Sequence, residues 1–187
     1  MFKDKNIVIG ITGGIACYKA CDIISYLVHE GACVNVIMTK NATEFITPLT
    51  LETLSKHKVV VDMFEEKDYI EVEHISLAKK ADIILVVPAT ANIIGKVANG
   101  IADDMLSTTI MATTSKVVFA PAMNDAMYNN KIVQDNISKL KQYGYKFIEP
   151  QEGNLACGYK AIGKLADKNT IIDSIKNILE SDDKNGM

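Results

Sequence analysis

Apolar runs of strand length alternate along this chain with segments in which apolar residues recur at helical spacing. The predicted strands are Asn6–Gly10, Val34–Met38, Val59–Asp62, Asp82–Val87, Lys116–Ala120 and Lys146–Ile148. The predicted helices are Ala16–Glu30, Leu49–Ser55, Ser76–Lys80, Ala91–Ala98, Asp104–Ala112, Ile132–Tyr143 and Thr170–Glu180. This alternation predicts a Rossmann-like, doubly wound α/β sheet of about six parallel strands, connected by crossover helices.

Prolines and glycines mark the expected ends of several elements. The run Ile83–Val87 is apolar throughout, which is typical of a central parallel strand buried on both faces. Pro88 is expected to stop this strand, and Pro121 is expected to stop the next one. Gly31 and Gly144 stand where helix C-terminal glycines are expected.

The composition predicts one compact domain. The chain has 187 residues, of which 48% are hydrophobic and 23% charged, and no linker or repeat interrupts the pattern. We expect a single domain over residues 1–180, followed by a polar tail at 181–187. The formal charge of −3 gives no general support for nucleic acid binding. The lack of a signal peptide or of ~18 consecutive apolar residues predicts a cytoplasmic protein without a membrane span.

The cysteines and histidines do not have the spacing of a metal site or a disulfide framework. The four cysteines include no Cys-x-x-Cys pair, and the three histidines are scattered along the chain. Cys17 and Cys21, one helical turn apart, are interpreted as half-buried thiols on a packed face. No metal is therefore expected.

The turn after the first strand suits a phosphate group. Gly10–Ile15 links a strand to a helix, and its backbone amides could hold a phosphate or a ring edge. The spacing is not Gly-x-Gly-x-x-Gly, and the second strand ends in Thr39 and Lys40 instead of the carboxylate that meets an NAD ribose. A hydroxyl and a cation favour a mononucleotide such as FMN, with an NADP 2′-phosphate as the second choice. A helix cap and a solvated lysine are the alternative.

Polar residues also lie near the other predicted elements. Thr90 and Asn92 begin a helix at the ligand edge of the sheet, although helix capping explains Thr90 equally well. Asp103 and Asp104 are adjacent carboxylates whose expected role is an acidic helix start and not acid–base catalysis. His74, taken alone, is a structural or surface histidine.

The most informative segments are Pro121–Asn124 and Gly153–Gly158. The first follows an apolar strand, where open α/β sheets bind ligands, and its Asn124 offers an amide that can hold an anion. The second is expected in a loop and places Cys157 between glycines. A thiol that can give a proton could therefore close over a ligand there.

The order of these motifs resembles the family of homo-oligomeric flavin-containing cysteine decarboxylases, over about residues 5–180. The motifs are Gly13–Ala16, Glu73–Ile75, Pro88–Asn92, Gly100–Asp104, Pro121–Asn124 and Leu155–Gly158. The resemblance implies an FMN enzyme that decarboxylates 4'-phosphopantothenoylcysteine in coenzyme A biosynthesis. The alternatives are a peptidyl-cysteine decarboxylase of peptide-antibiotic maturation, a flavin prenyltransferase and a non-catalytic flavin-binding regulatory subunit.

The chemistry implied by the resemblance explains the need for a flavin. Loss of carbon dioxide leaves an electron pair on carbon, and an amidated cysteine offers no carbonyl or imine to receive it. In the implied mechanism, flavin oxidises the substrate thiol to a thioaldehyde, which takes up the electrons as carbon dioxide leaves. The enethiolate that results is then reduced by the flavin, so no external oxidant is consumed.

The resemblance also assigns roles to residues. It implies that His74 is the base of the oxidative decarboxylation, that Asn124 holds the substrate carboxylate, and that Cys157 protonates the enethiolate. Met123 and Ala156 are the other implied substrate contacts, and the Cys157 segment is an implied flap. The implied FMN contacts are Gly13, Gly14, Ile15, Thr39, Thr90, Ala91, Asn92, Ile93 and Ala122.

One departure from the family concerns the flap. The family tends toward Gly-x-Gly-Arg after the cysteine, whereas this chain has Ala161–Lys164. Alanine stiffens the segment, and lysine replaces a bidentate fork with a point charge.

The resemblance further implies an assembly. Members form trimers, which in some cases assemble into dodecamers, with active sites between protomers. Bacterial members are often fused to a ligase that adds cysteine to phosphopantothenate. This chain ends before such a domain, so it resembles either a stand-alone decarboxylase or one excised from a bifunctional protein, and a separate ligase is an expected partner.

Overall fold

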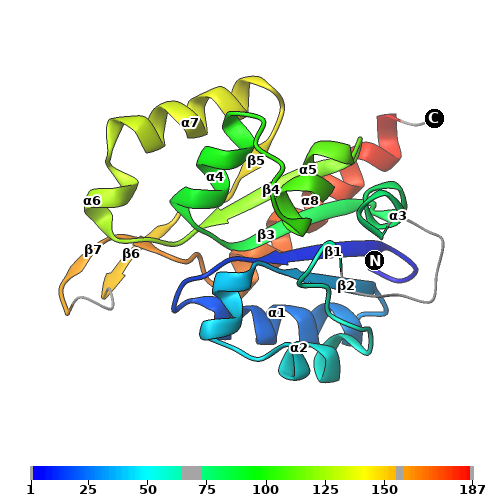
Figure 1. The fold of residues 1–187 in the computed structure, drawn as a ribbon. Coiled ribbons are helices and arrows are strands. Elements are labelled where there is room, and N and C mark those ends of the chain that lie inside the picture. The colour runs from blue at the N-terminus through cyan, green and yellow to red at the C-terminus, as the bar shows by residue number, and fades with distance from the viewer. Residues whose placement is uncertain (1, 65–72, 155–157, 186–187) are drawn as a thin grey trace.

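The computed structural model describes residues 2–64, 73–154 and 158–185, and its centre is a five-stranded parallel sheet (Figure 1). The strands are β1 (Asn6–Ile11), β2 (Cys33–Met38), β3 (Ile83–Ala89), β4 (Lys116–Pro121) and β5 (Lys146–Phe147). Their order across the sheet is β2-β1-β3-β4-β5, and each neighbouring pair is parallel. The direction of winding reverses between β1 and β3, which confirms the predicted doubly wound α/β class.

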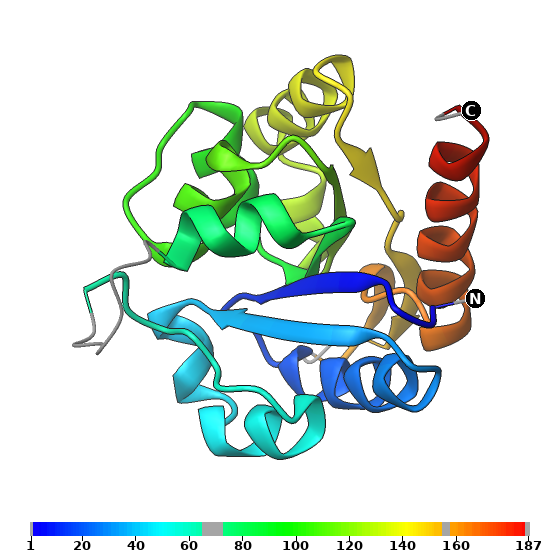
Figure 2. The ribbon, with the colours of Figure 1, turned by 90° about the vertical axis from the view of Figure 1, so that its right-hand side faces the viewer.

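Helices cover both faces of this sheet. One face carries α1 (Cys17–His29), α2 (Pro48–Ser55) and α8 (Lys168–Asn185), with α1 in contact with both others. The other face carries α3 (Glu73–Lys80), α4 (Ala91–Ala98), α5 (Met105–Ala112) and α7 (Lys131–Gln142). Figure 2 shows β1 and β2, in blue, between the two sets. In the part of the chain that the structure describes, no helix has the length and apolar character to cross a bilayer.

The apolar alternation of the central strands divides the core in two. Ile83, Leu85 and Val87 of β3 belong to the core under α1 and α8, whereas Ile84 and Val86 belong to the core under α4, α5 and α7. All five side chains are fully buried, as the continuous apolar run predicted.

The glycines at two helix ends adopt the predicted conformation. Gly31 and Gly144 follow α1 and α7 with φ angles of +86° and +90°. A left-handed residue after a helix is readily supplied by glycine, so both helices end where the sequence indicates. At the other end of the chain, α8 continues past Glu180 to Asn185.

The predicted strand Val59–Asp62 is wrong, and the sheet has five strands instead of six. Val60 makes an isolated parallel bridge to Ile37, with its N–H 3.0 Å from the Val36 oxygen and its oxygen 2.9 Å from the Met38 N–H. The residues beside Val60 do not continue this ladder. A short apolar run can bury one residue against a sheet edge without becoming a strand.

The prolines do not stop the strands where predicted. β3 continues through Pro88 to Ala89, and β4 includes Pro121. The register of β3 against β4 shifts between Val86 and Ala89, which accommodates a residue without an N–H inside the ladder.

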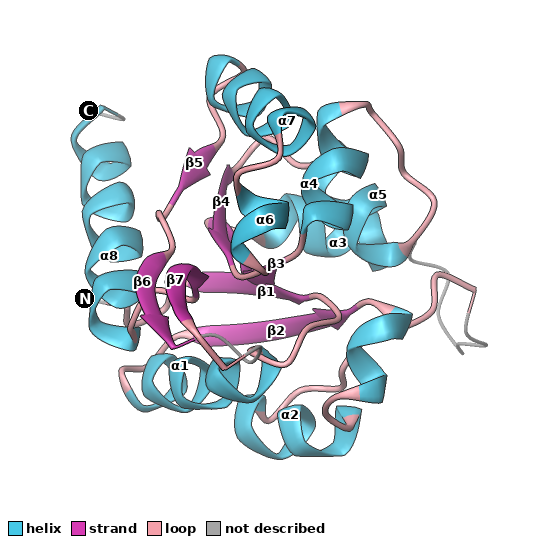
Figure 3. Cartoon of the chain, turned by 90° about the vertical axis from the view of Figure 1, so that its left-hand side faces the viewer, coloured by secondary structure: helices cyan, strands magenta, loops and turns pink. Residues whose placement is uncertain are grey.

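The segment expected to be a loop around Gly153 contains strands. β6 (Gln151–Asn154) and β7 (Lys160–Lys164) form a separate antiparallel pair in which Gly153 lies opposite Ala161. Figure 3 shows this pair beside the short helix α6 (Asp125–Tyr128), at the side of the molecule where β4 ends. A 3-10 helix, η1 (Lys40–Glu44), follows β2.

Candidate active site

The candidate site lies where the winding of the sheet reverses, at the carboxyl ends of β1 and β3. The buried Thr12 hydroxyl donates to the Pro88 oxygen at 2.7 Å and accepts from the Thr90 N–H at 3.1 Å. One side chain therefore holds together the two loops between which doubly wound proteins bind ligands.

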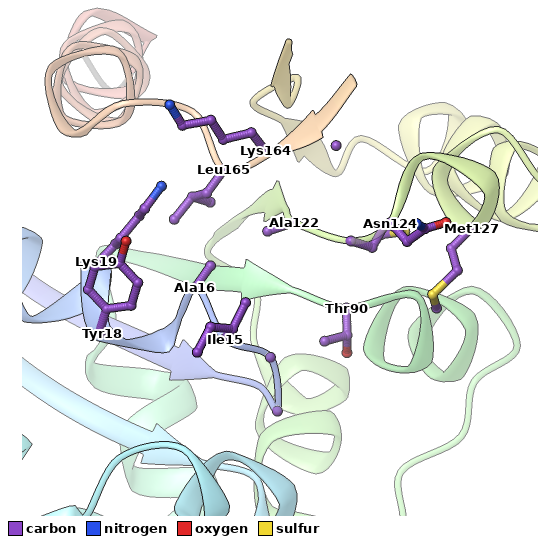
Figure 4. A pocket seen from close by; sticks show the side chains of 14 residues that line it. Ile15, Ala16, Tyr18, Lys19, Thr90, Ala122, Asn124, Met127, Lys164 and Leu165 are labelled. Atoms are coloured by element: carbon purple, nitrogen blue, oxygen red, sulfur yellow. The ribbon is translucent and has the colours of Figure 1, made fainter. Parts of the chain in front are cut away.

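A cavity of about 450 Å³ opens at this position (Figure 4). Its walls come from the turn after β1, the segment after β4, and the end of β7. Much of the lining is apolar, including Ile15, Ala122, Met127 and Leu165. The cavity can therefore accommodate a flat or extended apolar group, with polar groups at its margins.

A second cavity of about 370 Å³ adjoins the first and shares Gly13, Thr90 and Met127 with it. Its own lining includes residues after β2 and the first turn of α4. The expected cofactor residues are divided between the two cavities: Gly13, Gly14, Ile15, Thr90 and Ala122 line the first, and Gly13, Thr39, Thr90, Ala91, Asn92 and Ile93 line the second.

The start of α4 is suited to an anion. Thr90 is the N-cap residue, but its side chain makes no capping hydrogen bond. The capping interpretation of this hydroxyl is therefore wrong, and Thr90 is part of the lining shared by both cavities. The amides of a first helical turn point outward and carry partial positive charge, so the second cavity has donors for a phosphate.

Thr39 has an unusual hydroxyl. It lines the second cavity, and its Oγ1 is buried without a hydrogen-bond partner. Thr39 precedes η1, yet its side chain does not cap that helix. An isolated buried hydroxyl is unfavourable, so this group is suited to a ligand oxygen.

The turn after β1 contains Gly13 and Gly14, and an added side chain would meet different neighbours at the two positions. A Cβ on Gly13 would lie 2.6 Å from the Cβ of Asn41 and 2.9 Å from its backbone, so η1 could not approach as closely. A Cβ on Gly14 would lie 3.8 Å from the Thr90 side chain, which is ordinary contact across the first cavity. Gly13 thus shapes the wall, while Gly14 leaves space between α1 and Thr90.

Asn124 lies in the first cavity with its amide orientation fixed. It follows β4 and is the N-cap of α6, where its Oδ1 accepts from the Ala126 N–H at 2.9 Å. Its Nδ2 donates to the Tyr159 hydroxyl at 3.0 Å, and that hydroxyl in turn donates to Asp125. Because the oxygen is occupied by capping, an anion at this position would meet the donor side of the amide, Nδ2, and not its oxygen.

β7 is hydrogen-bonded to the segment after β4 that contains Asn124. The Met123 N–H donates to the Gly163 oxygen at 3.0 Å. Gly163 has φ +134°, and a Cβ there would lie 2.3 Å from the Met123 oxygen. This close approach places Lys164 and Leu165 in the wall of the first cavity.

The two aspartates near α5 are used structurally. Lys96 Nζ lies 2.6 Å from Asp103 and 2.7 Å from Asp104, and Asp104 caps α5 by accepting from the Ser107 N–H at 2.8 Å. Burial acts to raise the pKa of Asp104, but Lys96 and Ser107 outweigh it and the pKa is lowered. The predicted acidic helix start is confirmed, because Asp104 is the N-cap.

Two of the expected catalytic residues are not placed with Asn124. His74 is in the first turn of α3 and lines neither cavity, and Figure 1 shows α3 and α6 on opposite sides of the molecule. Cys157, like Ala156, lies outside the described residues. Within this chain, the structure therefore brings together the expected cofactor residues, Met123 and Asn124.

The structure adds residues that were not expected at the site. Thr12, Lys19, Met127 and Tyr159 contact the cavities or the residues that line them. Lys19 lies in the first turn of α1, directly after the turn that carries Gly13–Ile15, and this closeness in sequence could have indicated that it lines the same cavity. Tyr159 contacts Asn124 across 35 positions, and no local pattern predicts this contact.

Comparisons with known proteins show the family to which this chain is related. The model of the family described as Flavoprotein matches residues 1–180. A relative from Borreliella burgdorferi named coenzyme A biosynthesis bifunctional protein CoaBC is 56% identical over 177 residues, covering 95% of this chain and 45% of the relative. A probable phosphopantothenoylcysteine decarboxylase from Streptococcus mutans is 45% identical, covering 94% of this chain and 99% of the relative. The chain thus spans less than half of the bifunctional relative but nearly all of the shorter one.

Solved structures show the same architecture. A PPC decarboxylase mutant complexed with pantothenoylaminoethenethiol superposes with a TM-score of 0.84 at 27% identity, covering 95% of this chain and 100% of that one. The FMN-dependent cysteine decarboxylase SpaF gives a TM-score of 0.82 at 30% identity, covering 93% and 96%. Because the family model extends over residues 1–180, with strong identity to curated relatives, this chain belongs to the Flavoprotein family.

Proposed function

We propose that the protein is an FMN-dependent decarboxylase that converts 4'-phosphopantothenoylcysteine to 4'-phosphopantetheine in coenzyme A biosynthesis, with residues 1–180 as the catalytic domain. The observation that carries the proposal is the joined pair of cavities, which ends at the donor amide of Asn124. The 45% identity to a probable phosphopantothenoylcysteine decarboxylase of nearly the same length supports the choice of substrate.

The residues present fit FMN. The second cavity offers the unpartnered Thr39 hydroxyl and the first-turn amides of α4 to a phosphate, and the first offers an apolar space beside Gly14 and Ala122. The other proposed cofactor contacts are Gly13, Ile15, Thr90, Ala91, Asn92 and Ile93. When bound, FMN supplies a two-electron acceptor that takes electrons from the substrate thiol and returns them after carbon dioxide has left.

Asn124 is proposed to bind the substrate carboxylate through its Nδ2 group. The capping bond from Ala126 holds the amide oxygen away from this role, so the carboxylate meets a donor and not a second acceptor. A neutral donor orients the carboxylate without the strong ground-state stabilisation that a cation would give to a group that must leave. Met123, beside Asn124 in the lining, would contact the same part of the substrate.

His74 and Cys157 are proposed to move the protons. His74 would act as the base of the oxidative decarboxylation, and Cys157 would protonate the carbon of the enethiolate, with Ala156 beside the substrate. α3 lies far from α6 in one chain, so His74 would reach Asn124 from a second copy (Figure 1). The proposed active form is therefore a homo-oligomer, either a trimer or a dodecamer built from trimers, with each site between protomers.

A separate or attached ligase is the proposed functional partner. The relative from Borreliella burgdorferi is a bifunctional protein of which this chain covers 45%. The remaining part of such a protein would supply the cysteine-containing substrate.

The second candidate function is decarboxylation of a peptide with a C-terminal cysteine. It is supported by the similarity to a solved structure described as the peptidyl-cysteine decarboxylase EpiD, at a TM-score of 0.78 and 25% identity. The test is carbon dioxide release from purified FMN-loaded protein, given 4'-phosphopantothenoylcysteine or a cysteine-ended peptide in separate reactions. We expect release from the first compound. Turnover of the peptide alone would replace the proposed function with the second candidate, and turnover of neither would reject both.

A further inference from the structure

Two lysines lie at the end of the first cavity that is remote from Asn124. Lys19 comes from the first two turns of α1, and Lys164 is the last residue of β7. Figure 4 shows both ammonium groups on the same side of the cavity, across Ala122 from the amide of Asn124. Two elements that are far apart in the sequence thus direct positive charge to one place.

These two charges are not balanced by acidic side chains. Among residues 2–64, 73–154 and 158–185, neither lysine has an ion-pair partner, whereas Lys141 and Lys160 each have one and Lys96 has two. The Nζ of Lys19 lies over the ring of Tyr18, 6.0 Å from its centre, and a contact with a neutral ring does not cancel the charge. Burial lowers the pKa of Lys19, and the positive charge of Lys164 lowers it further. A pair of neighbouring cations without a counter-ion is stabilised by a bound dianion.

The position of Lys164 depends on contacts that the fold maintains. The Gly163 oxygen accepts from Met123, and the side chain of Lys164 crosses Gly153, where a Cβ would lie 2.6 Å from its Cδ. Gly153 is buried under this stem. The absence of a side chain at Gly153 therefore lets Lys164 lie across β6 toward the cavity.

The proposed position of the cofactor phosphate is in the second cavity, away from the two lysines. Thr39 and the first turn of α4 line the second cavity, and neither lysine does. The donors for two phosphates are thus separated, one set in each cavity.

We propose that Lys19 and Lys164 bind the terminal phosphomonoester of the substrate while Asn124 holds the carboxylate at the other end of the cavity. This inference rests on the proposed function, since it assigns the substrate phosphate to a site within the same cavity. Lysine binds phosphate as a point charge and does not require the planar geometry of a guanidinium. The pair makes the enzyme selective for a phosphorylated substrate over a peptide, which ends in no dianion at this distance.

The test compares substrates with and without the phosphate in FMN-loaded enzyme. The ratio of the KM for pantothenoylcysteine to the KM for its 4'-phosphorylated form is measured for wild type, Lys19→Gln and Lys164→Gln. We expect each substitution to lower this ratio about tenfold, because the lost contact is made to the phosphate alone. Lys164→Arg keeps the charge and should retain most of the ratio. Lys160→Gln is the matched control on the same strand, since Lys160 pairs with Glu152 at 3.6 Å and lines neither cavity, and it should leave the ratio unchanged.

A second measurement does not depend on turnover. Equilibrium binding of 4'-phosphopantetheine and of pantetheine to the FMN-loaded proteins should show the same loss of preference for the phosphate in both glutamine variants. An unaltered preference would overturn the inference even if the enzyme decarboxylates its substrate. A selective loss of FMN over riboflavin would also overturn it, because the lysines would then hold the cofactor phosphate. If wild type decarboxylates neither substrate, the proposed function fails, and the binding preference still decides the role of the lysines.

Discussion

Replacing Thr39 by valine should stabilise the protein without cofactor and weaken FMN binding. Valine has nearly the shape of threonine but no hydroxyl, and the Thr39 Oγ1 is buried without a partner. A hydroxyl in this state costs about 1–3 kcal/mol, so its removal should raise the free energy of unfolding of the apoprotein by about 1–2 kcal/mol. For a chain of this size, that gain corresponds to a rise of about 2–8 °C in Tm.

The effect on the cofactor has the opposite sign. A hydrogen bond to a charged phosphate contributes about 1.5–3 kcal/mol, so Thr39→Val should weaken FMN binding about 10- to 150-fold. Riboflavin, which lacks the phosphate, should lose much less affinity. Thr39→Ser is the matched control, because it keeps the hydroxyl and loses only the methyl group.

The assay is a pair of measurements on the same samples. Thermal unfolding of flavin-free protein gives the Tm, and titration with FMN and riboflavin, followed by flavin fluorescence, gives the two affinities. A lower apoprotein Tm in Thr39→Val, together with unchanged FMN affinity, would refute the reasoning. The hydroxyl would then have a structural partner and no contact with the phosphate.

Three further predictions concern other parts of the site. Gly13→Ala should lower the Tm and loosen η1, because the new Cβ would lie 2.6 Å from the Cβ of Asn41. Gly14→Ala should keep the Tm and reduce flavin affinity, and equal losses of Tm in the two variants would contradict the different roles of these glycines. Asp104→Asn should lower the free energy of unfolding by about 1–2 kcal/mol at neutral pH. The folded pKa of Asp104 is lowered, so the free-energy difference between wild type and variant should shrink as the pH falls from about 4 through that pKa. Urea titrations measure this difference, and a value that stays constant with pH would contradict a stabilising charge on Asp104. His74→Asn and Asn124→Ala proteins should each be inactive. When they are dissociated, mixed and reassembled, about one quarter of the sites should regain activity if the two residues meet between protomers. No recovery would place both residues of a site in one chain.

The central sheet could be predicted from the sequence because local pattern determines it. The apolar run at Ile83–Val87 and the glycines Gly31 and Gly144 act through burial and backbone conformation, which depend on few neighbours. Val59–Asp62 has the same local pattern but lies where the sheet edge allows a single bridge at Val60. Whether a short apolar run becomes a strand depends on partners that the run itself does not specify.

The part of the candidate site that lies at the carboxyl ends of strands could be predicted from the sequence. Thr39, Thr90 and Asn124 each follow a strand, and parallel topology brings such positions to one edge. Lys19 and Tyr159 were missed because their role depends on tertiary contacts, namely the cavity wall and the hydrogen bond to Asn124. His74 marks a different limit, since the structure of one chain leaves it away from the cavities.

The most direct test of the account is sustained turnover without oxygen. FMN-loaded protein is given a large excess of 4'-phosphopantothenoylcysteine under anaerobic conditions, and carbon dioxide, product mass and flavin absorbance are followed together. The account predicts equal amounts of carbon dioxide and 4'-phosphopantetheine over many turnovers, with the flavin recovered in its oxidised form. A reaction that stops after one carbon dioxide per flavin, or that releases none, would contradict a redox-neutral decarboxylation at this site.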